Sequence, residues 1–488
     1  MKFFGVALVA AAVEMFAFGA ESYREPLRPQ YHFSPAKNWT NDPNGLVFYK
    51  GEYHLFYQHN PVGDKWGHMS WGHAVSADMV HWQHLPVALA EENGVMIFSG
   101  SVVVDPNTSG LCTGSADCLV AIYTGHTEAR QSQHLAVSND RGRTWTKFAK
   151  NPVLDLSMKD FRDPKVFWYA PGKNWVMVVA MPDQYKVRLF KSQNLKAWEP
   201  LSEFGPAGST GGNWECPDLF PLPIEGKPGI AKWVLSVNLN PGGPQGGSAN
   251  QYFVGDFDGT RFLNAIAPEV TLWADYGSDF YASTSFSDIP ANDGRRIWIG
   301  WLSNWLYAND EPTSPWRGVQ TFPRALRLRE MPEGLRLVQE PVVELQRLRQ
   351  RALHLSNVTI DEANKQLAQF HGQSYEMEVD GAEAVHVLKG EGQETIVSVR
   401  DAVSIDRRHS GNVSFHKDFA KLHTSVAARN RRLKIFVDQS VVDVFANDGL
   451  TVLTDRVFPA PTSDRVALAG GSADRVTLTI WKMNSAWK

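Results

Sequence analysis

The chain has 488 residues, of which 43% are hydrophobic, and 48 Lys and Arg against 52 Asp and Glu give a formal net charge of -4. This near balance excludes the basic surface that binding to nucleic acids or anionic membranes requires, so neither partner is expected. The length predicts two or three soluble domains. The 17 Trp and 28 Pro residues are typical of β architectures with sites that stack on rings.

The N-terminus has the pattern of a secretory signal peptide over residues 1–20. Lys2 precedes an apolar run that ends in small residues, although Glu14 interrupts it. Such a segment directs secretion and is removed from the mature protein. No later stretch is long and apolar enough to span a bilayer. We therefore expect a secreted, extracellular protein.

Residues 21–330 have a sequence pattern that predicts many short strands. Apolar or alternating runs of five or six residues are separated by Gly, Asn, Asp and Pro. A Ser or Asp turn leading to an aromatic residue recurs at roughly 54- to 63-residue intervals. The copies are Ser76–Trp82, Ser138–Trp145, Ser192–Trp198 and a looser Gly255–Phe262, with a fifth expected near Trp298–Trp305. This repeat predicts a five-bladed β-propeller.

The sequence pattern changes after the predicted propeller. Residues 331–352 are charged and are expected to form one helix or an ordered linker. Residues 353–488 return to alternating runs, which predict a β-sandwich. The fold class is therefore all-β, a five-bladed β-propeller followed by a C-terminal β-sandwich.

The three cysteines leave one question open. Cys112 and Cys118 flank a short turn and form either a loop disulfide or two free thiols. Cys216 adjoins Glu215, and we expect it to pack behind a site rather than to act as a nucleophile. Glycosylation sequons occur at Asn107, Asn357 and Asn412, and a further one at Asn38 lies in a motif assigned to a pocket floor.

Three motifs each hold an acidic residue in an unusual setting. Asp42 lies in Asn-Asp-Pro-Asn-Gly, where Pro fixes the backbone and Gly permits a turn. Asp163 lies in Phe-Arg-Asp-Pro, and Glu215 in Trp-Glu-Cys-Pro-Asp. Each string alone could equally be a plain turn or a surface ion pair with no role in catalysis. Three acids on three blades, however, would converge on one axial pocket.

Convergent carboxyl groups point to glycoside hydrolysis. That reaction needs one carboxylic acid to protonate the leaving oxygen and one carboxylate to attack or to activate water. Crowding raises the pKa of one carboxyl group and keeps it protonated. A metal site built from His73, His126 and Asp218 is the alternative, but no typical ligand spacing supports it. No metal and no cofactor are expected.

The motifs together resemble glycoside hydrolase family thirty-two, the invertase, inulinase and levanase group. They occur in the family's order from about Tyr31 to the C-terminus. The matching strings begin at Asn41, Phe56, Trp66, Trp71, Phe98, Arg162, Trp214 and Gly300, with sandwich strings at Ile435, Val441 and Asn447. The resemblance implies a propeller with an appended sandwich and a double-displacement mechanism with retention.

The resemblance also implies a role for each site residue. Asp42 would be the nucleophile, Glu215 the acid/base and Asp163 a carboxylate that holds fructose hydroxyls and favours the transition state. Arg162 would donate hydrogen bonds near Glu215 or the sugar. The remaining residues expected to line the fructose subsite are Asn41, Gln58, Trp66, Phe98, Ser99 and Trp301.

The expected function is a secreted retaining β-fructofuranosidase that hydrolyses sucrose, with a small sugar as its partner. Exo-action on inulin or levan is the nearest alternative. An arabinanase-like inverting enzyme would need its carboxyl groups farther apart, roughly 6.5 to 9.5 Å. A fructan-binding lectin without turnover is the alternative outside enzymes.

Overall fold

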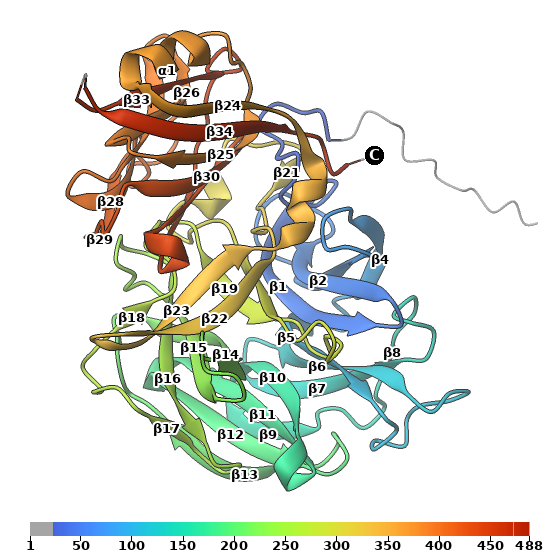
Figure 1. Ribbon diagram of the computed structural model, residues 1–488. Coiled ribbons are helices and arrows are strands. Elements are labelled where there is room, and N and C mark those ends of the chain that lie inside the picture. The colour runs from blue at the N-terminus through green and yellow to red at the C-terminus, as the bar shows by residue number, and fades with distance from the viewer. Residues whose placement is uncertain (1–22, 472, 488) are drawn as a thin grey trace, which may run out of the picture.

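A computed structural model describes residues 23–471 and 473–487 and is nearly all-β (Figure 1). The signal peptide expected at residues 1–20 lies outside the described residues. One α-helix occurs in the described part, α1 (Ile360–Leu367), begun by a capping box between Thr359 and Glu362. The described chain has no helix that is both long and apolar enough to cross a membrane. The short 3-10 helices are η1 (Ala170–Gly172), η2 (Pro182–Gln184), η3 (Ala308–Asp310), η4 (Val343–Leu348) and η5 (Asn447–Gly449).

Residues 38–341 form five antiparallel sheets in chain order. The first contains β1 (Asn38–Tyr49), β2 (Glu52–Asn60), β3 (Ser70–Ser76) and β4 (Gln83–Leu89). The second contains β5 (Met96–Asp105), β6 (Cys118–His126), β7 (Gln131–Ser138), β8 (Thr146–Lys147) and β9 (Leu154–Met158). The third contains β10 (Arg162–Tyr169), β11 (Asn174–Met181), β12 (Lys186–Ser192) and β13 (Glu199–Phe204).

The last two of these sheets follow the same order. The fourth contains β14 (Asn213–Pro223), β15 (Ala231–Asn240), β16 (Ala249–Phe257), β17 (Phe262–Asn264) and β18 (Leu272–Trp273). The fifth contains β19 (Tyr281–Ser285), β20 (Arg296–Trp301), β22 (Arg324–Met331) and β23 (Gly334–Pro341). The short β21 (Trp316–Arg317) lies between β20 and β22 in the chain and pairs in parallel with β1 of the first sheet. This pairing ties the last sheet to the first.

The first strands of the five sheets lie next to one another. β1 contacts β5, β5 contacts β10, β10 contacts β14, β14 contacts β19, and β19 contacts β1. Apolar side chains fill the space between each pair of neighbouring sheets and bury the sheet faces that would be exposed to water in an isolated sheet. Representative pairs are Trp71 with Leu119, Ile122 with Met177, Val178 with Leu235, Phe220 with Trp298, and Leu55 with Ile299. The arrangement is consistent with a propeller.

The sequence repeat marks equivalent places in four sheets. Its four copies begin at or near the end of β3, β7, β12 and β16, and each leads into the fourth strand of its sheet. In the third copy, Trp198 Nε1 donates to Leu195 O at 3.1 Å and closes the turn. The prediction of a fifth copy near Trp298–Trp305 is wrong. That segment contains the second strand, β20, and the equivalent turn joins β22 to β23 without an aromatic residue.

Residues 331–352 differ from the expected helix or linker. Much of the segment is β23, the outer strand of the fifth sheet, and only Val343–Leu348 is helical, as η4. The charged residues that resembled a helical surface alternate along the strands instead. Arg327 and Glu340 on the paired β22 and β23 form an ion pair at 2.8 Å.

The C-terminal part has two stacked sheets, coloured orange to red in Figure 1. One contains β24 (Arg349–Thr359), β34 (Arg475–Met483), β25 (Ser374–Asp380), β30 (Arg432–Asp438), β31 (Val441–Ala446) and β32 (Thr451–Arg456). The other contains β29 (Leu422–Ala427), β28 (Ala402–His409), β27 (Gln393–Ser398), β26 (Ala384–Gly390) and β33 (Arg465–Ala469). Met377, Val397 and Ile480 belong to the shared core, as in a β-sandwich.

Buried ion pairs join the two parts of the molecule. Arg324, on β22, contacts Asp275 at 3.0 Å and Asp443 of the sandwich at 2.9 Å. Arg407 of the sandwich contacts Asp279 at 2.6 Å. All of these side chains are almost fully buried, so their charges depend on one another for compensation. The sandwich is therefore fixed in place against the fifth sheet.

Candidate active site

A pocket of about 380 Å³ lies where the first strands of the five sheets meet. Thirteen of its sixteen lining residues lie on β1, β2, β5, β6, β7, β10, β14, β15 and β19, and the other three lie in loops. The lining residues are Asn41, Asp42, Gln58, Trp66, Phe98, Ser99, His126, Gln131, Asp160, Arg162, Asp163, Asn213, Glu215, Asn240, Tyr281 and Trp305. All three sequence-predicted acids are among them.

Each of the five first strands is irregular where it reaches this pocket. The pairing register shifts between Thr40 and Pro43, Ile97 and Gly100, Arg162 and Lys165, Glu215 and Asp218, and Tyr281 and Thr284. A bulge releases a residue from the strict alternation of a strand and turns its side chain in a new direction. Asp163 and Cys216 have φ angles of 64° and 44°, the left-handed region that such residues seldom adopt. The bulges therefore direct the site residues into the pocket.

Asp42 is held on the pocket floor by three donors. The Ser99 hydroxyl donates to Oδ2 at 2.6 Å, Asn41 Nδ2 donates to Oδ1 at 2.9 Å, and the Cys216 thiol donates to Oδ2 at 3.3 Å. Burial raises the pKa of Asp42 from its ordinary value, and the hydrogen bond from Ser99 opposes that rise. The carboxyl group is fixed in orientation and poorly hydrated, as an attacking group must be.

Asp163 lies beside Asp42, and the two share the Cys216 side chain. The Cys216 N–H donates to Asp163 Oδ2 at 3.1 Å, and Cys216 Sγ lies 3.7 Å from the same oxygen. Burial raises the pKa of Asp163, the nearby Arg162 lowers it, and the charges of Glu215 and Asp42 raise it further. Two carboxyl groups at one thiol concentrate negative charge at the bottom of the pocket.

Glu215 is gripped by a guanidinium group. Arg162 donates to Glu215 Oε1 from Nε at 3.0 Å and from Nη2 at 2.7 Å, and its Nη1 donates to Asp160 at 2.8 Å. The Tyr281 hydroxyl donates to the other carboxylate oxygen, Oε2. Both oxygens of Glu215 are thereby positioned. With 21% of its side chain exposed, Glu215 is the most accessible of the three acids.

Aromatic rings form the rim. Trp66 is 41% exposed and lies edge-on to Phe98, with 6.2 Å between centroids. Phe98 stacks on His126 at 4.2 Å. Such surfaces bind the apolar faces of sugar rings, while the amides and acids below them bind hydroxyl groups. Gln58 is fixed by its Nε2 donation to Ile97 O at 3.0 Å.

Trp301 is the predicted residue that the structure does not place in the pocket lining. Its side chain is fully buried and packs against Trp39 and Trp305. Trp305 lines the pocket instead. The reason is that Trp301 is the last residue of β20, whereas Trp305 lies in the loop that follows this strand.

Several lining residues were not predicted from the sequence. They are His126, Gln131, Asp160, Asn213, Asn240, Tyr281 and Trp305. Asp160 and Asn213 lie within three residues of a predicted acid, so proximity in sequence is a signal for them. Tyr281 begins the first strand of the fifth sheet, for which no acidic motif directed attention to the pocket.

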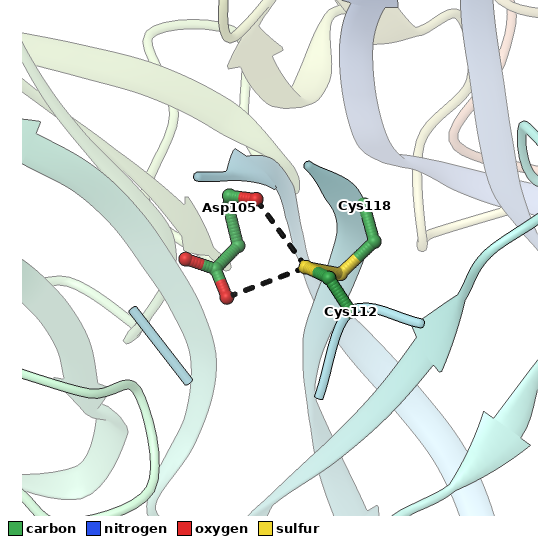
Figure 2. A group of neighbouring side chains, drawn as sticks. All are labelled: Asp105, Cys112 and Cys118. Atoms are coloured by element: carbon green, nitrogen blue, oxygen red, sulfur yellow. Dashed lines mark hydrogen bonds between the residues drawn. A yellow bond between two sulfur atoms is a disulfide. The ribbon is translucent and has the colours of Figure 1, made fainter. Parts of the chain in front are cut away.

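Two of the three cysteines form a disulfide and the third is a free, buried thiol. Cys112 and Cys118 form a disulfide, which decides the question that the sequence left open (Figure 2). Asp105 is adjacent, and its oxygens accept hydrogen bonds from Thr108 and Ser109 at 2.5 to 3.0 Å. With both sulfurs joined, neither is a thiolate ligand, so these three residues are not a metal site in this state. Burial raises the pKa of the free Cys216 well above its usual range, which keeps it a protonated donor.

The residues of the rejected metal alternative lie in different surroundings. His73 is buried, stacks on Phe56 at 4.0 Å and bonds to His54. His126 lines the pocket, and Asp218 pairs with Lys165 at 3.3 Å. The described residues thus offer no cluster of these three side chains.

Two family models match this chain. The model for the "Glycosyl hydrolases family 32 N-terminal domain" covers residues 32–341, and that for the "Glycosyl hydrolases family 32 C terminal" covers residues 344–482. The chain belongs to glycoside hydrolase family 32. The resemblance noted in the motifs is confirmed, and the protein is a glycoside hydrolase.

Known relatives include enzymes named for fructan hydrolysis. A levanase from Bacillus subtilis is 49% identical, covering 98% of this chain and 74% of the relative. An extracellular exo-inulinase from Aspergillus awamori is 38% identical, covering 96% of each, and its crystal structure superposes with a TM-score of 0.87 at 36% identity, covering 95% of this chain and 100% of that one. A β-fructofuranosidase from Schwanniomyces occidentalis, complexed with fructosyl-erythritol, has a TM-score of 0.85 at 32% identity, covering 95% and 99%.

Proposed function

We propose that this enzyme is a retaining β-fructofuranosidase that releases terminal β-D-fructofuranosyl residues by double displacement. The observation that carries the proposal is the common thiol: Cys216 Sγ lies 3.3 Å from Asp42 and 3.7 Å from Asp163, and Glu215 is the adjoining residue. Three acids at one point match a reaction that needs a nucleophile, an acid and stabilisation of a cationic ring.

In the first step, Asp42 attacks the anomeric carbon of the fructosyl unit. Glu215 gives its proton to the glycosidic oxygen, so the C–O bond breaks and the leaving sugar departs with a new hydroxyl group. A fructosyl ester of Asp42 remains. Asp163 accepts hydrogen bonds from fructose hydroxyls, and its negative charge favours the positive charge that builds on the ring.

In the second step, Glu215 acts as a base. It removes a proton from water, the water oxygen bonds to the anomeric carbon, and the ester bond to Asp42 breaks. Arg162 and Tyr281 hold the Glu215 carboxyl group in one place through both steps. Two inversions give net retention at the anomeric carbon.

Two substrate classes are supported equally. Sucrose is the substrate expected from the sequence, and levan or inulin, attacked from the fructose end, is the alternative. The names of the levanase and the exo-inulinase support the alternative, and the name of the β-fructofuranosidase supports the first reading. The pocket of about 380 Å³ has room for a terminal sugar and part of its neighbour, which suits either class.

The same proposal extends to architecture and location. The signal peptide is residues 1–20, and the closed five-bladed β-propeller, expected over 21–330, extends to residue 341 because β23 completes its fifth sheet. The β-sandwich, expected over 353–488, begins with β24 at Arg349. The ring of contacts from β1 to β19 and back supports closure. The extracellular exo-inulinase supports secretion, and Asn107, Asn357 and Asn412 are exposed sites for glycans.

The test compares three variants on sucrose. Asp42→Asn and Glu215→Gln are expected to lose about 10³-fold or more in kcat while keeping the circular dichroism and Tm of a folded protein. Asp155→Asn, an acid outside the pocket that pairs with Arg130 at 2.9 Å, serves as the control and keeps full activity. A variant of either proposed catalytic acid that retained most of the rate would contradict the assigned roles.

Product analysis tests stereochemistry and substrate. NMR of the first product formed is expected to detect β-fructofuranose, and the α anomer would establish inversion and exclude double displacement. Sucrose, raffinose, inulin and levan are then compared at equal concentration. Release of fructose from the polymers assigns the fructan class, whereas turnover of sucrose and raffinose alone assigns the invertase class.

A further inference from the structure

A second cavity lies farther along the same strands, away from the candidate active site. Its volume is about 440 Å³. On β10, Asp163 lines the active-site pocket and Lys165 lines the second cavity; on β14, Glu215 lines the first and Asp218 the second. The residues between them surround a void of only about 20 Å³. The packed centre therefore separates two chambers.

Charges in the second cavity are balanced. Lys165 and Arg296 are matched by Asp218 and Asp288, and Lys165 Nζ lies 3.3 Å from Asp218 Oδ2. A phosphate or carboxylate would face two carboxyl groups, and a cation would face two basic groups. The site therefore favours a ligand without net charge.

Hydrogen-bonding capacity in this cavity exceeds what the described residues use. Asp218 is 1% exposed, and its Oδ1 has no partner among residues 23–471 and 473–487. Asp288 Oδ2 accepts from the Val104 N–H at 2.9 Å, with no bond described for its Oδ1. Arg296 donates from Nη1 to Phe286 O at 3.1 Å, with none described from Nε or Nη2. Donors and acceptors side by side suit hydroxyl groups, which do both.

Aromatic rings supply the walls. Trp168 is 43% exposed although it follows two buried or half-buried strand residues, and its ring lies edge-on to Trp175 at 5.2 Å. Trp233 also lines the cavity, and its ring centroid lies 5.6 Å from that of Phe167. Packing of the sheet does not require an exposed Trp beside buried charges. A flat apolar face next to unfilled donors and acceptors is the pattern of a sugar site.

We propose that this cavity is a second, non-catalytic site that binds a neutral sugar. The ring stacks on Trp168, and its hydroxyl groups bond to Arg296 and Asp288, with Asp218 and Lys165 beneath. The site goes beyond the proposed reaction and does not depend on it, because no group of the first pocket takes part. Binding forms and breaks no covalent bond.

The test uses fructose and glucose as probes. Crystals soaked in either sugar are expected to contain it against Trp168. In solution, saturation-transfer NMR titrations of the whole enzyme are expected to resolve a binding component that Trp168→Ala weakens about tenfold, the loss expected for a stacked ring. Leu263→Ala is the control, since Leu263 is also 43% exposed but lines neither cavity. Trp168→Ala is expected to keep kcat and KM for the enzyme's best fructoside.

Two results would overturn the inference. One is sugar density confined to the active-site pocket, together with equal affinities of wild type and Trp168→Ala for both sugars. The other is displacement of the sugar by inorganic phosphate at equal concentration, which would assign an anion site. Neither result bears on the roles of Asp42 and Glu215, which their own variants decide, so the two proposals fail separately.

Discussion

Replacing Ser99 by Ala is expected to shift the acid limb of the pH profile to higher pH. Asp42 attacks only when ionised, burial raises its pKa, and the 2.6 Å hydrogen bond from Ser99 lowers it. A hydrogen bond to a charged group contributes about 1.5 kcal/mol or more. One pKa unit corresponds to about 1.4 kcal/mol, so losing the donor raises the Asp42 pKa by about one unit.

The assay is kcat/KM against pH, which reports groups of the free enzyme. The acid limb moves up by about one unit, and the alkaline limb stays in place because the Ser99 hydroxyl donates to Asp42. Ser101→Ala is the matched control: it removes a buried hydroxyl from the same strand, β5, but its bond runs to Pro164 O rather than to a carboxyl group. An unmoved acid limb in Ser99→Ala, or an equal shift in Ser101→Ala, would refute the reasoning.

Three further predictions concern stability. Burial raises the pKa of Asp163 in the folded state from 3.8 to about 7, so the folded protein favours the protonated carboxyl group and loses stability as pH rises through that pKa. Asp163→Asn should therefore gain Tm relative to wild type between about pH 4 and about pH 7, measured by calorimetry, and a constant difference would contradict this. Arg324→Leu strands Asp275 and Asp443 and should cost about 3 to 5 kcal/mol of unfolding free energy in denaturant titrations, whereas Arg408→Ala, an exposed pair with Asp406, should leave it unchanged. Replacing Cys112 and Cys118 by Ser opens a loop with a separation of six residues and should cost about 2 kcal/mol, with the wild type falling to the same value in reductant.

The sequence predicted the parts of the fold that repeat. Four turns between a Ser, Asp or Gly and an aromatic residue marked the ends of β3, β7, β12 and β16, because each closes the same hairpin. The fifth sheet lacks that turn chemistry, so the pattern was lost at Trp298–Trp305. The charged residues on β22 and β23 resembled the exposed face of a helix. They lie on two paired strands instead, and sequence alone does not show which charge on one strand pairs with which charge on the other.

At the site, the motifs predicted the three acids but not the residues that surround and position them. Asp42 and Asp163 stand out because each directly precedes a Pro, and Glu215 because it lies two residues before Pro217 in an unusual string. Tyr281 and Trp305 lie in ordinary sequence, and only the closing of the fifth sheet beside the first brings them to the pocket. Trp301 was misplaced because two Trp residues four apart differ in orientation once one ends a strand and the other lies in a loop.

The five bulges on the first strands have a consequence for how this site can change. Regular pairing along the rest of each sheet holds its first strand in place, while each irregular stretch sets the direction of its own side chains. A substitution at one bulge therefore leaves the sheets in place, but it affects the other walls through shared side chains, since Cys216 contacts both Asp42 and Asp163. The pocket changes as a linked set of side chains, on a frame that does not have to move.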